Sequence, residues 1–145
     1  MSAAPKPDPD DYVLDDQIGY LLRLASQRHA ALFQARTIEG LTPTQFAVMI
    51  RLGEAGPCSQ NHLGRLAALD VATVKGVVDR LAAKGLVTVT PDRTDHRRRV
   101  VALSPKGRAI MPKLHALGHR ITEDTLAPLT PAEREALVAL LRRLG

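Results

Sequence analysis

The sequence predicts a mainly α-helical protein with long helices at both ends and one short β-hairpin between them. Three observations predict this class. Apolar residues recur at helical spacing near both termini. Three Ser/Thr-Pro pairs, at residues 42–43, 104–105 and 130–131, are typical helix starts. Two β-branched runs, at residues 86–90 and 99–103, flank a turn-forming segment.

Length and composition place the chain among single-domain proteins with a basic surface. It has 145 residues, 45% of them apolar, and a net charge of +5, which suits one core and a polyanionic partner. No stretch approaches the roughly 18 to 20 apolar residues of a membrane span, so we expect no membrane partner. Cys58 is the single cysteine, and a chain without disulfides is expected in the cytoplasm. We expect a disordered tail over residues 1–11 and one domain over residues 12–145.

The first helix is expected over residues 12–35. Its apolar positions are spaced by three and four and form one stripe, which consists of Leu14, Ile18, Leu21, Leu22, Ala25, His29 and Leu32. A helix of this length is marginal in water on its own and needs a surface to pack against.

Three further helices are expected in the middle of the chain. Thr42 caps the first, which begins at Pro43 and runs to the glycines at 53 and 56. Ser59 caps a short helix over residues 60–67, and Asp70 caps another over residues 71–84. Gly85 then supplies a left-handed stop.

The helices over residues 60–67 and 71–84 form a helix-turn-helix pattern. Apolar residues of the second helix predict its buried side, while Thr73, Lys75, Gly76 and Arg80 lie on its outer side. In such motifs the second helix enters the major groove of DNA with its N-terminal part toward the bases. A low aromatic content of 3% argues against single-strand binding by base stacking.

The β-hairpin completes a winged helix-turn-helix lobe over residues 43–103. Its tip, residues 91–98, contains Arg93, Arg97 and Arg98, and an arginine there suits the negative potential of the minor groove. We expect Asp95 to hold Arg97 by a charge-assisted hydrogen bond and Asp92 to stabilise the turn. The predicted DNA-binding residues are Ser59, Gln60, Thr73, Lys75, Gly76, Arg80, Arg93, Asp95, Arg97 and Arg98.

Two helices close the chain. Ser104 begins one from Pro105 to about residue 126, and Thr130 with Glu133 forms a capping box for the last. The last helix carries an apolar stripe of Leu137, Leu140, Leu141 and Leu144.

These elements resemble the multiple antibiotic resistance regulator (MarR) family over residues 12–144. The resemblance rests on the segments SQNHLGRLAALDVATVKGVVDRLAAKGLV, PDRTDHRRR and VALSPKGR. The family's wing often contains Asp-x-x-Asp-Arg-Arg, whereas here His96 replaces the first arginine, so Arg97 inherits the minor-groove role. The resemblance implies a homodimer built from residues 12–35 and 105–145, on an inverted-repeat operator. It also implies repression relieved by a small anionic aromatic ligand.

The resemblance also directs attention to a ligand site on the first helix. Arg23 can bind a carboxylate through two hydrogen bonds, and His29 can donate to a phenol or carbonyl. Gln27 lies between them in the sequence. The expected effector is an aromatic acid or aromatic acyl-CoA. A salt-bridged arginine and a core histidine satisfied by the backbone are the alternative interpretations.

Other classes of function have weaker support. His115, His119 and Glu123 share a helical face and offer a metal-sensing alternative, although an exposed polar row is commoner. Cys58 offers a redox-sensing alternative, although it more simply fills a small buried space. A non-specific nucleoid-type DNA-binding protein would share the charge. We find no phosphate loop, nucleophile elbow or metalloprotease helix, so we expect neither an enzyme nor a cofactor.

Overall fold

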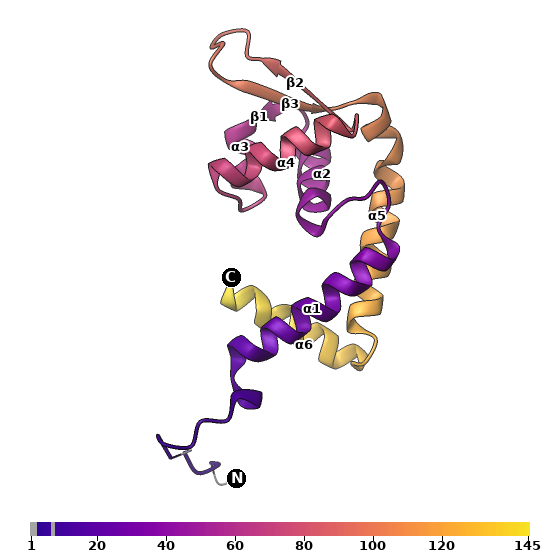
Figure 1. The fold of residues 1–145 in the computed structure, drawn as a ribbon. Helices are drawn as coiled ribbons and strands as arrows, with labels where there is room; N and C mark the ends of the chain where they lie inside the picture. The colour runs from indigo at the N-terminus through magenta and orange to yellow at the C-terminus, as the bar shows by residue number, and fades with distance from the viewer. Residues whose placement is uncertain (1–2, 7) are drawn as a thin grey trace.

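The computed structural model describes residues 3–6 and 8–145 and is mainly helical (Figure 1), as the sequence predicts. The predicted tail includes residues 1, 2 and 7, which lie outside the described residues. The elements in order are η1 Leu14–Asp16, α1 Ile18–Arg36, α2 Pro43–Ala55, β1 Cys58–Ser59, α3 Gln60–Leu66, α4 Val71–Ala83, β2 Val87–Pro91, β3 Arg99–Leu103, α5 Pro105–Leu126 and α6 Pro131–Leu144.

All five predicted capping residues are confirmed, because each side chain accepts a hydrogen bond from a backbone N–H of the first helical turn. They are Thr42, Ser59, Asp70, Ser104 and Thr130. Both threonines form complete capping boxes. Gly85 has φ +72° directly after α4, a conformation that glycine adopts at little cost. The sequence therefore places the starts of these helices correctly.

The N-terminal helix begins later than predicted. The backbone of Gln17 is extended (φ −85°, ψ 133°) and separates the single turn η1 from α1. The Gln17 side chain donates to the carbonyl of Val13 at 3.1 Å, which stabilises this break. The apolar spacing continues through the break, which explains why periodicity alone extended the helix to residue 12.

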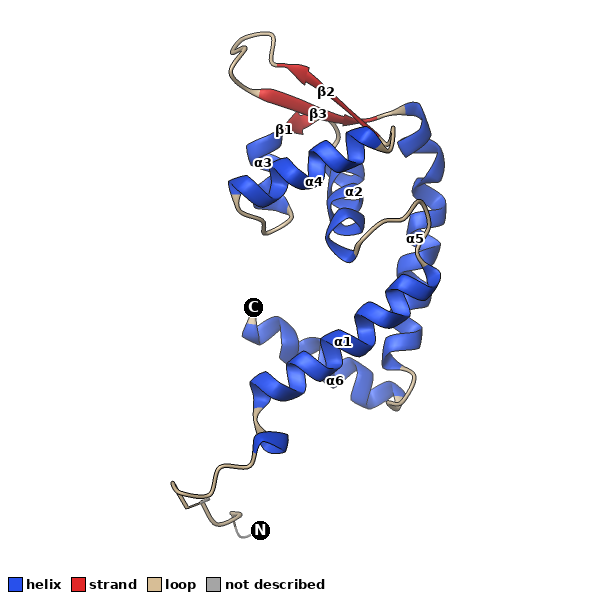
Figure 2. Cartoon of the chain, in the orientation of Figure 1, coloured by secondary structure: helices blue, strands red, loops and turns tan. Residues whose placement is uncertain are grey.

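The sheet has three strands, whereas the sequence predicted two. β1 pairs antiparallel with β3 through Cys58 opposite Val101 and Ser59 opposite Val100, and the strand order is β1-β3-β2. A two-residue strand is too short to show an alternating pattern. Figure 2 shows the long hairpin of β2 and β3 projecting beyond the helices, and β1 fixes its base to the start of α3.

The hydrophobic core belongs to the lobe formed by α2–α4, the sheet and α5. Fully buried side chains include Val48, Leu52, Leu63, Leu81 and Leu86. In contrast, α1 buries only Phe33 among its residues, and no residue of α6, which is described throughout, is buried. Figure 1 places α1 and α6 at the end of α5 away from the wing. The terminal helices are therefore largely uncovered in a single chain.

Candidate nucleic-acid interface

The second helix of the helix-turn-helix, α4, has the two faces that the sequence predicts. Val74, Val77, Val78 and Leu81 are buried in the core. Thr73, Lys75 and Arg80 are exposed, and Gly76 is half-buried. Thr73 and Lys75 lie in the N-terminal part of the helix, which is the part expected to face the bases, whereas Arg80 lies in its last turn.

Asp79 links α4 to the base of the wing. Its carboxylate accepts hydrogen bonds from Lys75 Nζ at 2.8 Å and from Arg99 Nη2 at 3.3 Å. These two cations hold the pKa of Asp79 below its ordinary value, Lys75 having the larger effect. Because Arg99 begins β3, this contact orients the hairpin relative to α4.

The wing tip is ordered by two aspartates, as predicted. Asp92 Oδ1 accepts hydrogen bonds from the Thr94 backbone N–H at 2.8 Å and from its hydroxyl at 2.9 Å. Asp95 Oδ1 accepts from Arg97 N at 3.1 Å and Nε at 3.3 Å. The Arg97 side chain is nonetheless 93% exposed. Asp95 therefore orients this arginine while leaving it free to contact a partner.

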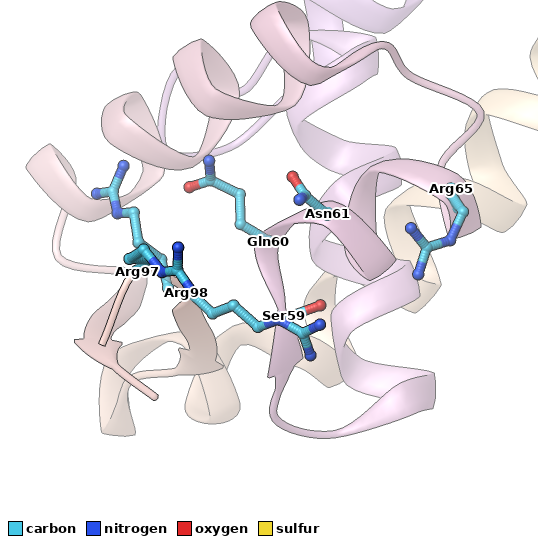
Figure 3. Close-up of a pocket in the computed structure, with 7 residues that line it drawn as sticks. Ser59, Gln60, Asn61, Arg65, Arg97 and Arg98 are labelled. Carbon is cyan, nitrogen blue, oxygen red and sulfur yellow. The ribbon is translucent and has the colours of Figure 1, made fainter. Parts of the chain in front are cut away.

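A pocket of about 200 Å³ lies between the start of α3 and the base of the wing (Figure 3). Its walls are Ser59, Gln60 and Asn61, together with Arg65 and residues 97–99. Gln60 is only 9% exposed, and its Oε1 has no hydrogen-bond partner among the described residues. The structure thus brings together Ser59, Gln60, Arg97 and Arg98 of the predicted DNA-binding set.

Sequence analysis missed three residues that line this pocket, and also the exposed Val71 of α4. Asn61 and Arg65 line the pocket from α3, and Arg99 lines it from β3. The spacing of four between Asn61 and Arg65 places them on one helical face, and this signal was available in the sequence. Val71, at the start of α4, is 69% exposed, which is unusual for a valine and suits contact with a thymine methyl group.

The three predicted ligand-binding residues, all on α1, differ in exposure and in partners. Arg23 is exposed and lies over the ring of Tyr20, at 5.4 Å from its centroid. Gln27 is exposed, and half-buried His29 makes a 2.9 Å hydrogen bond with the hydroxyl of Thr125. His29 therefore has a partner on α5 within the same chain, while Arg23 remains available.

The metal and redox alternatives gain no geometric support. Across residues 3–6 and 8–145, no three His, Cys, Asp or Glu side chains are placed to hold a metal ion, and His115 and His119 are exposed on α5. Cys58 is half-buried on β1, and burial raises the pKa of its thiol. A raised pKa disfavours the reactive thiolate.

Comparison with known proteins identifies the family. A family model described as "MarR family" matches residues 39–98. The HTH-type transcriptional repressor NicR of Pseudomonas putida is 38% identical over 144 residues, which cover 99% of this chain and 90% of NicR. This chain belongs to the MarR family. It is a transcriptional regulator, and its relatives are regulators rather than enzymes.

Solved structures agree with this MarR-family assignment. A probable transcriptional regulator from Pseudomonas aeruginosa superposes with a TM-score of 0.87 at 53% identity, covering 92% of this chain and 100% of that one. Bordetella bronchiseptica BpsR, whose DNA binding is regulated by 6-hydroxynicotinic acid, gives a TM-score of 0.84 at 41% identity, covering 92% of this chain and 96% of BpsR.

None of the helices in the described part of the chain has the length and apolar character of a membrane span.

Proposed function

We propose that this MarR-family regulator binds an inverted-repeat operator as a homodimer, with α4 in the major groove and Arg97 in the adjacent minor groove. The observation that carries the proposal is the bridge from Asp79 of α4 to Arg99 of the wing. It sets the wing beside the recognition helix while Arg97 projects into solvent. An arginine so placed suits the narrow, strongly negative minor groove.

The uncovered apolar surface of the terminal helices supports the homodimer. Among the described residues, the large apolar side chains that are exposed lie within residues 12–24 and 137–144, with Val71 as the single exception. Contiguous apolar surface of this kind marks a protein interface. A second copy related by a twofold axis covers it with the same residues and carries a second α4 to the next half-site.

Replacing Arg97 with alanine is expected to weaken operator binding by ten- to a hundredfold without lowering thermal stability. The side chain is 93% exposed and its contact with Asp95 is within the wing tip, so the fold loses little. On DNA, however, each half-site loses a cation, and the slope of log K against log salt falls by about one unit or more.

The measurement is fluorescence anisotropy with an operator selected from a random duplex pool, at several salt concentrations. Arg51→Ala, at an exposed position of α2 where the arginine pairs with Glu54, is the matched control. Competition with random duplex tests the nucleoid-type alternative, since a specific regulator prefers its operator by about a thousandfold or more. Unchanged affinity of Arg97→Ala at every salt concentration contradicts the wing's proposed role.

We also propose that the protein is a repressor released by an aromatic acid or its coenzyme A thioester, with Arg23 as the carboxylate partner. BpsR, a close structural relative, is regulated by 6-hydroxynicotinic acid, which is such an acid. Arg23 has an exposed guanidinium on α1, beside the leucines assigned to the dimer interface. Gln27, about one turn further along the same helix, and His29, rather more than one and a half turns further along, are the other two proposed ligand contacts.

Replacing Arg23 with alanine is expected to raise at least tenfold the effector concentration that releases DNA, while DNA affinity without effector stays unchanged. The physical reason is loss of a bidentate, charge-assisted contact with the carboxylate. Anisotropy with labelled operator and 6-hydroxynicotinic acid as the first probe measures it, and Gln34→Ala on the same helix is the control. If release by a responding acid is the same in Arg23→Ala and wild type, the residue assignment is wrong.

A further inference from the structure

The pocket between α3 and the wing carries an excess of positive charge. Four arginines surround about 200 Å³ of space: Arg65, Arg97, Arg98 and Arg99. Two carboxylates contact them, because Asp95 lies 3.3 Å from Arg97 and 3.9 Å from Arg98, and Asp79 lies 3.3 Å from Arg99. The polar contact of Arg65 is with the ring of His62, at 3.5 Å, and not with a carboxylate. Because Asp79 is shared with Lys75, at least two positive charges remain unbalanced, and an anion in the pocket would offset them.

Gln60 gives a second, independent indication that the pocket has an occupied state. Its side chain extends toward the wing arginines, with Arg65 on the opposite side (Figure 3). It is buried to more than nine-tenths, and its Oε1 accepts no hydrogen bond from the described residues. Buried polar atoms normally have partners, because removing them from water without one is costly. A donor is thus expected to reach this oxygen in the functional state.

We propose that this pocket binds one phosphate group of the DNA backbone and that Gln60 positions the wing arginines Arg98 and Arg99 on it, while Arg97 extends to the minor groove. This inference rests on the proposed function and deepens it. A phosphodiester offers only acceptor oxygens, so it binds guanidinium groups by charge-assisted, often bidentate hydrogen bonds. An arginine drawn inward by the phosphate has further N–H groups, and one of these donates to Gln60 Oε1. Gln60 is therefore a positioning residue whose hydrogen bond is completed only in the complex.

The variant Gln60→Leu distinguishes a positioning role from a structural one. It is expected to keep or raise thermal stability while it lowers affinity for DNA. Leucine removes the unpaired oxygen and keeps a similar volume, so the thermal midpoint is expected to stay the same or rise. Affinity for a random-sequence duplex is expected to fall about tenfold, because the arginines lose their orienting acceptor. A residue that only supports the fold would lose stability and affinity together, and that result overturns the proposal.

Arg65→Gln tests the phosphate itself through salt dependence. Loss of one phosphate contact per lobe is expected to lower the slope of log K against log salt by about 0.9 for each lobe bound. Arg51→Gln removes the same charge from α2 outside the pocket and is expected to leave the slope unchanged. Equal slopes for Arg65→Gln and Arg51→Gln would contradict the site.

The same titrations distinguish failure of this inference from failure of the proposed function. If the wild-type protein does not bind duplex at low salt, the proposed function is wrong. If it binds, and Gln60→Leu and Arg65→Gln bind equally well, only the pocket inference is wrong. Free inorganic phosphate is the other possible ligand of the pocket. A titration with inorganic phosphate, monitored through the backbone amide resonances of residues 59–61, tests it. If phosphate saturates the wild-type protein but not Gln60→Leu, and both proteins bind duplex with equal affinity, the pocket binds free phosphate. That result overturns the assignment to the DNA backbone.

Discussion

Replacing Leu140 with aspartate is expected to convert the proposed homodimer into a monomer at micromolar concentration. Leu140 is 56% exposed in a single chain and lies on α6, which buries none of its 14 residues there. Burying a leucine contributes about 2 kcal/mol, and twofold symmetry counts each change twice. The lost burial alone, about 4 kcal/mol, weakens association roughly a thousandfold, and burying two unpaired carboxylates adds to it.

Sedimentation equilibrium over a range of protein concentrations measures this change. Glu135→Gln, also on α6, is the control and is expected to remain dimeric. Circular dichroism checks the fold, because the core of the lobe lies in α2–α5 and the sheet and does not depend on α6. If Leu140→Asp remains a dimer with the wild-type dissociation constant, the apolar stripe of α6 is not the interface.

Monomerisation is also expected to reduce operator affinity far more than it reduces random-duplex affinity. A dimer binds its second half-site as an intramolecular event, and that gain disappears when the copies separate. Contacts made by α4 and the wing within each lobe persist, so the lobe keeps its weaker, salt-dependent affinity. This contrast separates the contribution of the terminal helices from that of the DNA-binding surface.

The helix starts and the wing were predictable because their signals are local. A capping side chain acts on an N–H three residues away, as Asp70 does for Thr73 at 2.7 Å. The aspartates of the wing tip act over a similar range, as in the contact of Asp95 with Arg97. Such contacts are determined within a few residues and require no knowledge of the tertiary fold.

Features that depend on distant parts of the chain were not predictable. Strand β1 exists because β3, about forty residues later, offers it a free edge. The pocket residue Arg65 lines the same space as the wing arginines only because α3 packs beside the sheet. The burial of Gln60 has the same origin, because its sequence position next to a capping serine predicts an exposed residue. His29 forms a hydrogen bond with Thr125, which lies 96 residues later in the chain. No rule based on local sequence spacing predicts such a contact.

Gly107 lies at another such long-range contact, where the first turn of α5 meets the chain that leaves α4. A Cβ on Gly107 would lie 2.1 Å from the carbonyl oxygen of Leu86. That same oxygen accepts a hydrogen bond from Ser104 N at 3.0 Å, and the Ser104 hydroxyl donates to the Gly85 carbonyl at 2.6 Å. The close approach is between backbones, so no rotation of a side chain relieves the clash.

Replacing Gly107 with alanine is therefore expected to destabilise the protein by about 3 kcal/mol, which combines overpacking with partial loss of the Ser104 cap. The thermal midpoint would fall by about 10 °C. Ser104→Ala should cost about 1 kcal/mol, and Gly19→Ala, whose added Cβ meets nothing within 4 Å, should cost nothing. Thermal and urea unfolding measure all three, and a wild-type midpoint for Gly107→Ala would contradict the close contact.

The same substitution is expected to weaken operator binding even at temperatures where the protein stays folded. Leu86 follows α4 by three residues, and α5 leads directly to the terminal helices that, in the proposed homodimer, set the distance between lobes. A displacement of the start of α5 therefore changes the angle at which each α4 meets its groove. Because both half-sites must be bound together, a small change of angle weakens binding at each of the two half-sites. Operator affinity should accordingly fall by more than random-duplex affinity, and equal losses would show that α5 does not transmit orientation to α4.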